Sequence, residues 1–110
     1  MSVKKDFDIS RWQRLPIRIV KISEKILFFQ EVEVRTLELR QYFPSSEAQG
    51  AATCLYTVFI QTNLGSLEMK YIESRCNSQE LDRICFVLKD LMGISSLINR
   101  MMIELESYRR

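Results

Sequence analysis

The sequence contains no histidine, and this absence excludes the commonest forms of nucleophilic catalysis. A serine or cysteine nucleophile is usually activated by a neighbouring histidine that accepts its proton. Glycine is also scarce. Gly50, Gly65 and Gly93 are isolated from one another, whereas a phosphate-binding loop needs clustered glycines ahead of a helix. We therefore expect a protein that is not an enzyme and that holds no cofactor.

Cysteine is sparse as well, with Cys54, Cys76 and Cys85 separated by 22 and 9 positions. These spacings lack the close cysteine pairs of zinc modules, and there is no histidine to complete a metal site. Three cysteines cannot all pair within one chain, and a reducing compartment keeps them as thiols. The sequence predicts three free thiols in small core or surface positions, and no metal site.

Long apolar runs are missing too. The stretches Ile26 to Phe29 and Cys54 to Ile60 fall far short of the ~20 residues that a membrane-spanning helix needs. Residues 1–7 carry charges but lead into no apolar segment with a cleavage site, so we expect no secretory signal peptide. The expected location is the cytoplasm.

What the chain does have is an ordinary globular composition, with 46% hydrophobic and 27% charged residues in 110 positions. This length fits one domain over residues 1–110, with a basic N-terminal arm over residues 1–15. Residues 1–25 hold seven basic and three acidic side chains, while the remaining 85 hold nine and eleven. Such an uneven charge indicates attraction to an anionic surface, although a basic segment can also serve solubility alone. The candidate binding residues are Lys4, Lys5, Arg11, Trp12, Arg14 and Arg18.

Trp12 is the most suggestive of these residues because it lies between Arg11 and Arg14. An indole among guanidinium groups can stack on a nucleic-acid base or sit among lipid headgroups. As the sole tryptophan it can equally be a packing anchor that pins the N-terminal segment to the domain. Both interpretations stay open, with the packing anchor favoured.

The pattern from about residue 16 to residue 74 is typical of strands. Its alternation changes parity, since Val32 and Val34 are even positions whereas Leu37 and Leu39 are odd. Either a bulge or a turn near positions 35 and 36 resets the buried face, or the segment from Phe28 to Phe43 is helical. We favour two strand segments. Residues 44–50 have loop composition, and residues 54–74 predict a hairpin whose turn is residues 63–65, with Gly65 at a positive φ.

Two helices are expected after the hairpin. Asn77 and Glu80 form a capping box, which predicts a first helix over residues 78–92. Its apolar stripe is expected to face the sheet and consists of Leu81, Ile84, Cys85, Leu88, Leu91 and Met92. Gly93 is predicted to end that helix, and Ser95 to cap a second one that runs to about residue 107. The second helix has its own apolar stripe, consisting of Ile94, Leu97, Ile98, Met101, Met102 and Leu105.

The predicted fold class is therefore α+β, a curved antiparallel sheet followed by a C-terminal amphipathic helix and a second helical segment. Residues 56–93 carry the sequence YTVFIQTNLGSLEM, a turn, and then SQELDRICFVLKDLMG. This stretch resembles the C-terminal hairpin and helix of bacterial and organellar pleckstrin-homology-like domains. The resemblance implies that one helix closes a curved antiparallel sheet, and it implies no functional residue.

The predicted function is that of a non-catalytic interaction module, an adaptor or accessory subunit that binds another protein, with no small-molecule substrate. The alternative is a peripheral binder of nucleic acid or another anionic surface, such as a membrane, through the basic arm. The stripe of the second helix either covers the core or forms an interface. As an interface, it predicts a homodimer, because two copies then hide both stripes at one twofold contact.

Overall fold

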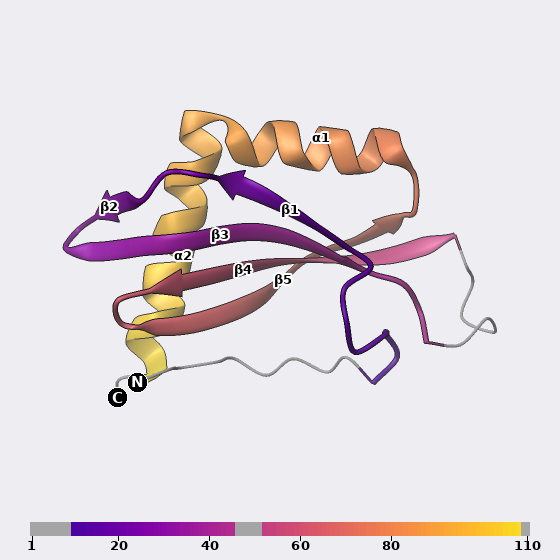
Figure 1. Cartoon of the computed structure of the whole chain (residues 1–110), viewed down its shortest axis with the longest axis horizontal. Coiled ribbons are helices and arrows are strands. Elements are labelled where there is room, and N and C mark those ends of the chain that lie inside the picture. Colours follow the sequence, from indigo (N-terminus) through magenta and orange to yellow (C-terminus); the bar gives the residue numbers. More distant parts are fainter. Residues whose placement is uncertain (1–9, 46–51, 109–110) are drawn as a thin grey trace.

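The computed structural model describes residues 10–45 and 52–108 and contains one antiparallel sheet followed by two helices (Figure 1). The sheet order is β1-β3-β4-β5, and β2 also pairs with β3. The predicted α+β fold class is confirmed. The elements are β1 Arg18–Ser23, β2 Leu27–Phe29, β3 Val32–Tyr42, β4 Thr53–Thr62, β5 Gly65–Arg75, α1 Ser78–Lys89 and α2 Leu91–Tyr108.

Both helices pack on the same face of the sheet. α1 buries Leu81, Ile84 and Leu88, which join one apolar cluster with inward-facing residues of β3, β4 and β5. Leu97, Met101 and Leu105 of α2 belong to the same cluster. In Figure 1, α1 lies along one border of the sheet and α2 runs across the strands. The opposite face of the sheet therefore has no helical cover, and its side chains are stabilised in another way.

β3 contains the bulge that the parity change indicated. Val34 pairs with Thr62 and Thr36 pairs with Gln61, so that Arg35 is an extra residue without a partner in β4. The bulge moves the buried face from even to odd positions, and Leu37 and Leu39 are then buried like Val32 and Val34. The segment up to residue 42 is one strand, and the helical alternative is wrong.

The hairpin of β4 and β5 is also confirmed. Gly65 has φ 139°, in the region that favours glycine, and pairs with Thr62 across the two-residue loop. The Thr62 hydroxyl accepts a hydrogen bond from the Leu64 amide at 3.0 Å. Asn63 Oδ1 accepts another from the Glu33 amide at 2.8 Å, which fastens the turn to β3.

A second tight turn lies where the sequence predicted continuous strand. Phe29 and Val32 pair across Gln30 and Glu31, whose φ values are 47° and 72°. Two successive positive φ angles are typical of a type I′ hairpin turn, which normally takes Asn-Gly. The sequence gives no turn signal here because glutamine and glutamate are not turn residues, and the backbone is strained as a consequence.

Replacing Glu31 by glycine is expected to raise the free energy of unfolding by about 1 kcal/mol, because glycine adopts this φ without strain. Urea unfolding followed by circular dichroism measures the change. Glu33→Gly is the matched control, since Glu33 lies in extended β3 and its replacement should lower stability. A Glu31→Gly protein no more stable than the wild type would contradict this account of the turn.

The two helices meet at a corner that differs from the prediction. α1 ends at Lys89, and Asp90 has extended backbone angles, with its carboxylate accepting from the Met92 amide at 3.2 Å. Asp90 therefore caps the start of α2, and Gly93 lies inside α2 rather than after α1. The predictions that Gly93 ends the first helix and that Ser95 caps the second are wrong. Gly93 is needed for close approach, since a Cβ there would lie 2.1 Å from the Val87 carbonyl oxygen.

Gly93→Ala is accordingly expected to destabilise the protein by about 1–2 kcal/mol, although alanine gains ~1 kcal/mol over glycine in helix propensity. The added methyl group meets backbone atoms, which cannot move aside as a flexible side chain can. The midpoint of thermal unfolding measures the loss. Ser95→Ala, at an exposed position of the same helix, should be neutral or stabilising, and a stabilised Gly93→Ala protein would refute the close approach.

Candidate interaction surfaces

The structure exposes twelve large apolar side chains among the described residues, and nine of them gather in two places. The first group, which we call the edge strip, follows the free edge of the sheet along β1 and β2. It consists of Leu15, Ile17, Ile19, Ile26 and Phe28, with exposed fractions of 78%, 42%, 50%, 57% and 75%. Single exposed apolar residues are ordinary, whereas a contiguous set marks an interaction surface.

The edge strip has this position because β1 and β2 pair with β3 on one side only. Directly opposed residues in an antiparallel pair point to the same face, so Ile19 opposite Arg40, and Phe28 opposite Glu33, point away from the helices. Their partners on β3 are polar, and the helices pack on the other face. These two apolar side chains therefore have no core to enter.

Four exposed cations accompany the edge strip, and Glu24 is the sole acidic residue between positions 14 and 28. Within the described residues none of the four forms an ion pair. The border of the sheet is consequently both apolar and positively charged. The four residues are Arg14, Arg18, Lys21 and Lys25.

The second group, which we call the helix corner, consists of Phe86, Val87, Leu91 and Met92. Their exposed fractions are 78%, 41%, 82% and 79%. They flank the α1–α2 junction that Asp90 and Gly93 create. The sharp turn of the chain brings the apolar residues at the end of α1 close to those at the start of α2.

The structure places the predicted N-terminal binding residues in different environments. Lys4 and Lys5 lie outside the described residues. Trp12 is 6% exposed and packs against Tyr42 and Leu55, so the packing-anchor interpretation is the correct one. Arg11 pairs with Glu73 at 3.2 Å and lies over the Trp12 ring, 5.8 Å from its centroid. Arg14 and Arg18 are exposed and belong to the cations of the edge strip.

The apolar stripe of the second helix covers the core. Leu97, Ile98, Met101 and Leu105 are at most 5% exposed, and Ile94 and Met102 pack against the main cluster. Leu91 and Met92, which the sequence assigned to the core-facing stripe of the first helix, are exposed at the helix corner instead. The stripe is thus not available as an interface, because its residues are already buried within the chain. A twofold contact would need another surface.

A buried polar cluster, which the sequence did not indicate, lies on the face of the sheet opposite the helices. The Glu68 carboxylate, 4% exposed, accepts hydrogen bonds from Tyr42 at 2.6 Å, Thr57 at 2.7 Å and the Arg40 guanidinium at 2.9 Å. The Arg40 guanidinium carbon also lies over the Phe59 ring, 3.9 Å from the ring centroid. Burial, followed by the hydrogen bond to Glu68, raises the pKa of Tyr42 to about 12, so its hydroxyl stays protonated and donates.

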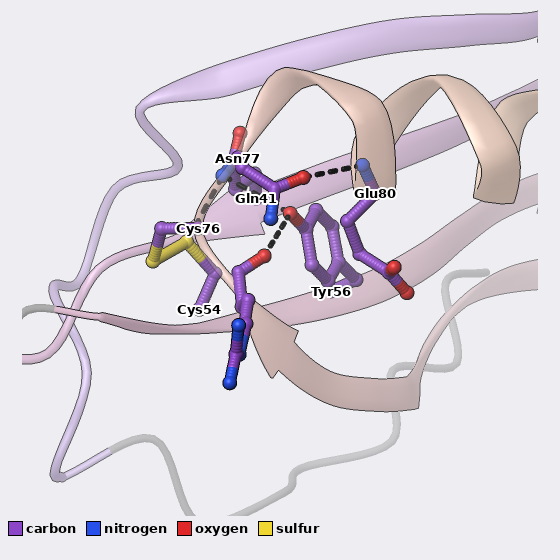
Figure 2. The surroundings of a disulfide bond; sticks show 7 residues. Gln41, Cys54, Tyr56, Cys76, Asn77 and Glu80 are labelled. Carbon is purple, nitrogen blue, oxygen red and sulfur yellow. Dashed lines mark hydrogen bonds between the residues drawn. A yellow bond between two sulfur atoms is a disulfide. The ribbon is translucent and has the colours of Figure 1, made fainter.

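The structure joins Cys54 and Cys76 in a disulfide, so the prediction of three free thiols is wrong (Figure 2). The two cysteines are brought together by the last pairs of the β4–β5 hairpin, with their Cα atoms 5.1 Å apart. Figure 2 shows the bond beside Gln41, whose side-chain amide donates to Cys54 Sγ at 3.0 Å, and next to the Asn77 cap of α1. Cys85 is the free thiol, and burial raises its pKa.

The described residues contain no helix that is long and apolar enough to cross a membrane, and no cluster of three or more metal-ligating side chains. Two adjoining hollows, of about 300 and 630 Å³, separate the Gln30–Glu31 turn from the second half of α2. Their lining is mixed. Carboxylates, amides and apolar side chains alternate in it, and it presents no constellation of reactive groups.

No protein family, curated protein or solved structure matches this chain. The resemblance of residues 56–93 to pleckstrin-homology-like domains therefore stays a prediction.

Reduction of the Cys54–Cys76 bond is expected to lower the free energy of unfolding by about 3 kcal/mol, because the bond constrains a 22-residue separation in the unfolded chain. Urea unfolding of the oxidised protein, with and without a phosphine reductant, measures the difference. Cys76→Ser should have the free energy of unfolding of the reduced wild type, with or without reductant. Cys85→Ser should lose the same free energy on reduction as the wild type does. A wild type that unfolds identically in both conditions would overturn the assignment.

Proposed function

We propose that this chain is a non-catalytic interaction module, an adaptor or accessory subunit that binds another protein. The observation that carries the proposal is the gathering of nine exposed apolar side chains into the edge strip and the helix corner. The chain buries its core elsewhere, so these nine exposed residues are not needed to complete that core. Exposed apolar groups of this kind are stabilised when a partner removes them from water.

The chemistry of the polar groups agrees with a role without catalysis. Both oxygens of the Glu68 carboxylate are engaged by side chains of the chain itself, and Tyr42 holds its proton. A general acid or base needs a group within reach of a substrate and a pKa near the working pH. This cluster is better suited to joining strands than to moving protons.

The proposed setting is the cytoplasm, where the glutathione and thioredoxin pools keep most cysteines reduced. Reduction of the Cys54–Cys76 bond in that compartment would cost the fold the stability, about 3 kcal/mol, that the bond is expected to supply. A second copy of the chain is one partner to consider. Since the stripe of α2 is buried, a homodimer would use the helix corner.

A second candidate function is supported by the cations beside the edge strip. Arg14, Arg18, Lys21 and Lys25 outnumber Glu24, which leaves this border with a net positive charge. An anionic surface such as nucleic acid or a lipid headgroup layer would be attracted to it. Affinity that falls steeply with added salt would identify this function, because an apolar protein contact responds little to salt.

The test is affinity purification of the tagged chain with quantitative mass spectrometry, using one variant for each surface. Phe86→Ser with Leu91→Ser alters the helix corner, and Ile19→Thr with Phe28→Thr alters the edge strip. We expect a protein partner, recovered in a fixed ratio, that one of these variants loses by at least tenfold. Circular dichroism verifies that each variant folds.

The control variant is Ile103→Ser with Tyr108→Ser, which removes exposed apolar groups outside both surfaces and should keep the partner. The proposal fails if no protein is recovered in a fixed ratio, or if all three variants retain the same proteins. Sedimentation of the wild type across micromolar concentrations shows whether the partner is a second copy.

A further inference from the structure

The border of the sheet at β1 differs from the opposite border at β5. Both are edge strands, and every second residue of an edge strand turns its backbone N–H and C=O away from the sheet. β5 contributes none of the exposed large apolar side chains, whereas β1, β2 and the residues that flank them carry the whole edge strip. α1 contacts β1 at this border, and the side chains of Arg18, Ile19 and Lys21 stay exposed beside it. The β1 border therefore combines the backbone of an edge strand with exposed apolar and cationic side chains.

The cations and the apolar residues lie on both sides of this border. Arg18 is opposite Gln41, which is buried on the helix side of the sheet beside Cys54. Ile19 and Lys21 are opposite Arg40 and Glu38, on the other side. A flat surface such as a membrane or a nucleic-acid backbone would reach one of these two sets. An added strand would reach both, because its side chains also alternate between the two faces.

We propose that β1 accepts an extended acidic strand from a partner protein, which lengthens the sheet by β-augmentation. This inference rests on the proposed function and names the chemistry of the partner. The backbone of the incoming strand pairs with the outer edge of β1. Its carboxylates lie beside Arg18 and Lys21 on opposite faces, and an apolar residue lies beside Ile19.

Charge excludes a second copy of this chain as the source of the strand. Two β1 strands paired with each other would bring Arg14, Arg18, Lys21 and Lys25 against the same four residues, with Glu24 as the sole acid on each side. Like charges opposed across two strands are destabilising. Cations on an edge strand ordinarily discourage chance pairing, and here they leave acidic strands as the ones that fit.

The probe is a set of fluorescent eight-residue peptides in which two glutamates stand three positions apart, and so on opposite faces of a strand, with valine, isoleucine, threonine or tyrosine at the other positions. The same peptides with lysine in place of glutamate are the comparison. Fluorescence anisotropy measures binding to the full chain, and amide hydrogen exchange locates it. We expect the glutamate peptides to bind at least tenfold more tightly than the lysine peptides, and to slow exchange in β1 but not in β5. Arg18→Gln with Lys21→Gln should weaken binding by about tenfold.

The matched control is Arg83→Gln with Lys89→Gln, which makes the same change of net charge on exposed positions of α1 and should leave binding unchanged. Arg18→Glu with Lys21→Glu should reverse the preference, so that the lysine peptides bind best. The inference is overturned if no peptide binds, if the control weakens binding equally, or if exchange slows elsewhere. It is also overturned if vesicles with anionic lipids or duplex DNA bind and the peptides do not.

The proposed function has a separate outcome. Suppose that the peptides do not bind at β1, but a partner is recovered from cells and is lost in the helix-corner variant. The β-augmentation at β1 would then be disproved, and the proposed function as an interaction module would still hold.

Discussion

The fold depends on how the face of the sheet without helices is closed, and Glu68 is central to this. Its carboxylate joins β5 to Thr57 of β4 and to Arg40 and Tyr42 of β3. A buried charge without partners is strongly destabilising, so these three donors are required for the strand to lie as it does. The packing of Phe59 under Arg40, and of Trp12 on Tyr42 and Leu55, continues the same surface toward the N-terminal segment.

The other face is governed by apolar packing, and its limits explain the exposed residues at the helix corner. Gly93 lets α2 approach the Val87 carbonyl, and this approach directs the stripe of α2 onto β3, β4 and β5. The same turn leaves Phe86, Leu91 and Met92 on the outer side of the bend. One backbone constraint thus both completes the core and creates an exposed apolar surface.

The sequence was informative where local chemistry decides the structure. The parity change between Val34 and Leu37 identified the β3 bulge, Gly65 identified a turn, and Asn77 identified the start of α1.

Prediction from the sequence failed where residues distant along the chain decide the structure. The strained Gln30–Glu31 turn is imposed by pairing of Phe29 with Val32, and Gly93 is explained by a contact with Val87 rather than by helix termination. Burial of Glu68 and union of Cys54 with Cys76 need the register of three strands, which periodicity does not contain. The residues of the edge strip were visible as apolar, but their exposure follows from β1 being at the border.

The rigidity of that border bears on how tightly it can bind. The anchored Trp12, the hydrogen bond from the Gln13 amide to the Phe43 carbonyl, and the one from the Ile17 amide to the Gln41 carbonyl fix the chain before β1 begins. An incoming strand would therefore meet an ordered edge, and the cost of ordering falls on the partner alone. The regular part of β1 is short, because its register with β3 shifts between Lys21 and Ser23. A few backbone pairs and two charged contacts favour a weak, reversible contact, whose selectivity comes from the sign of the charges more than from the buried area.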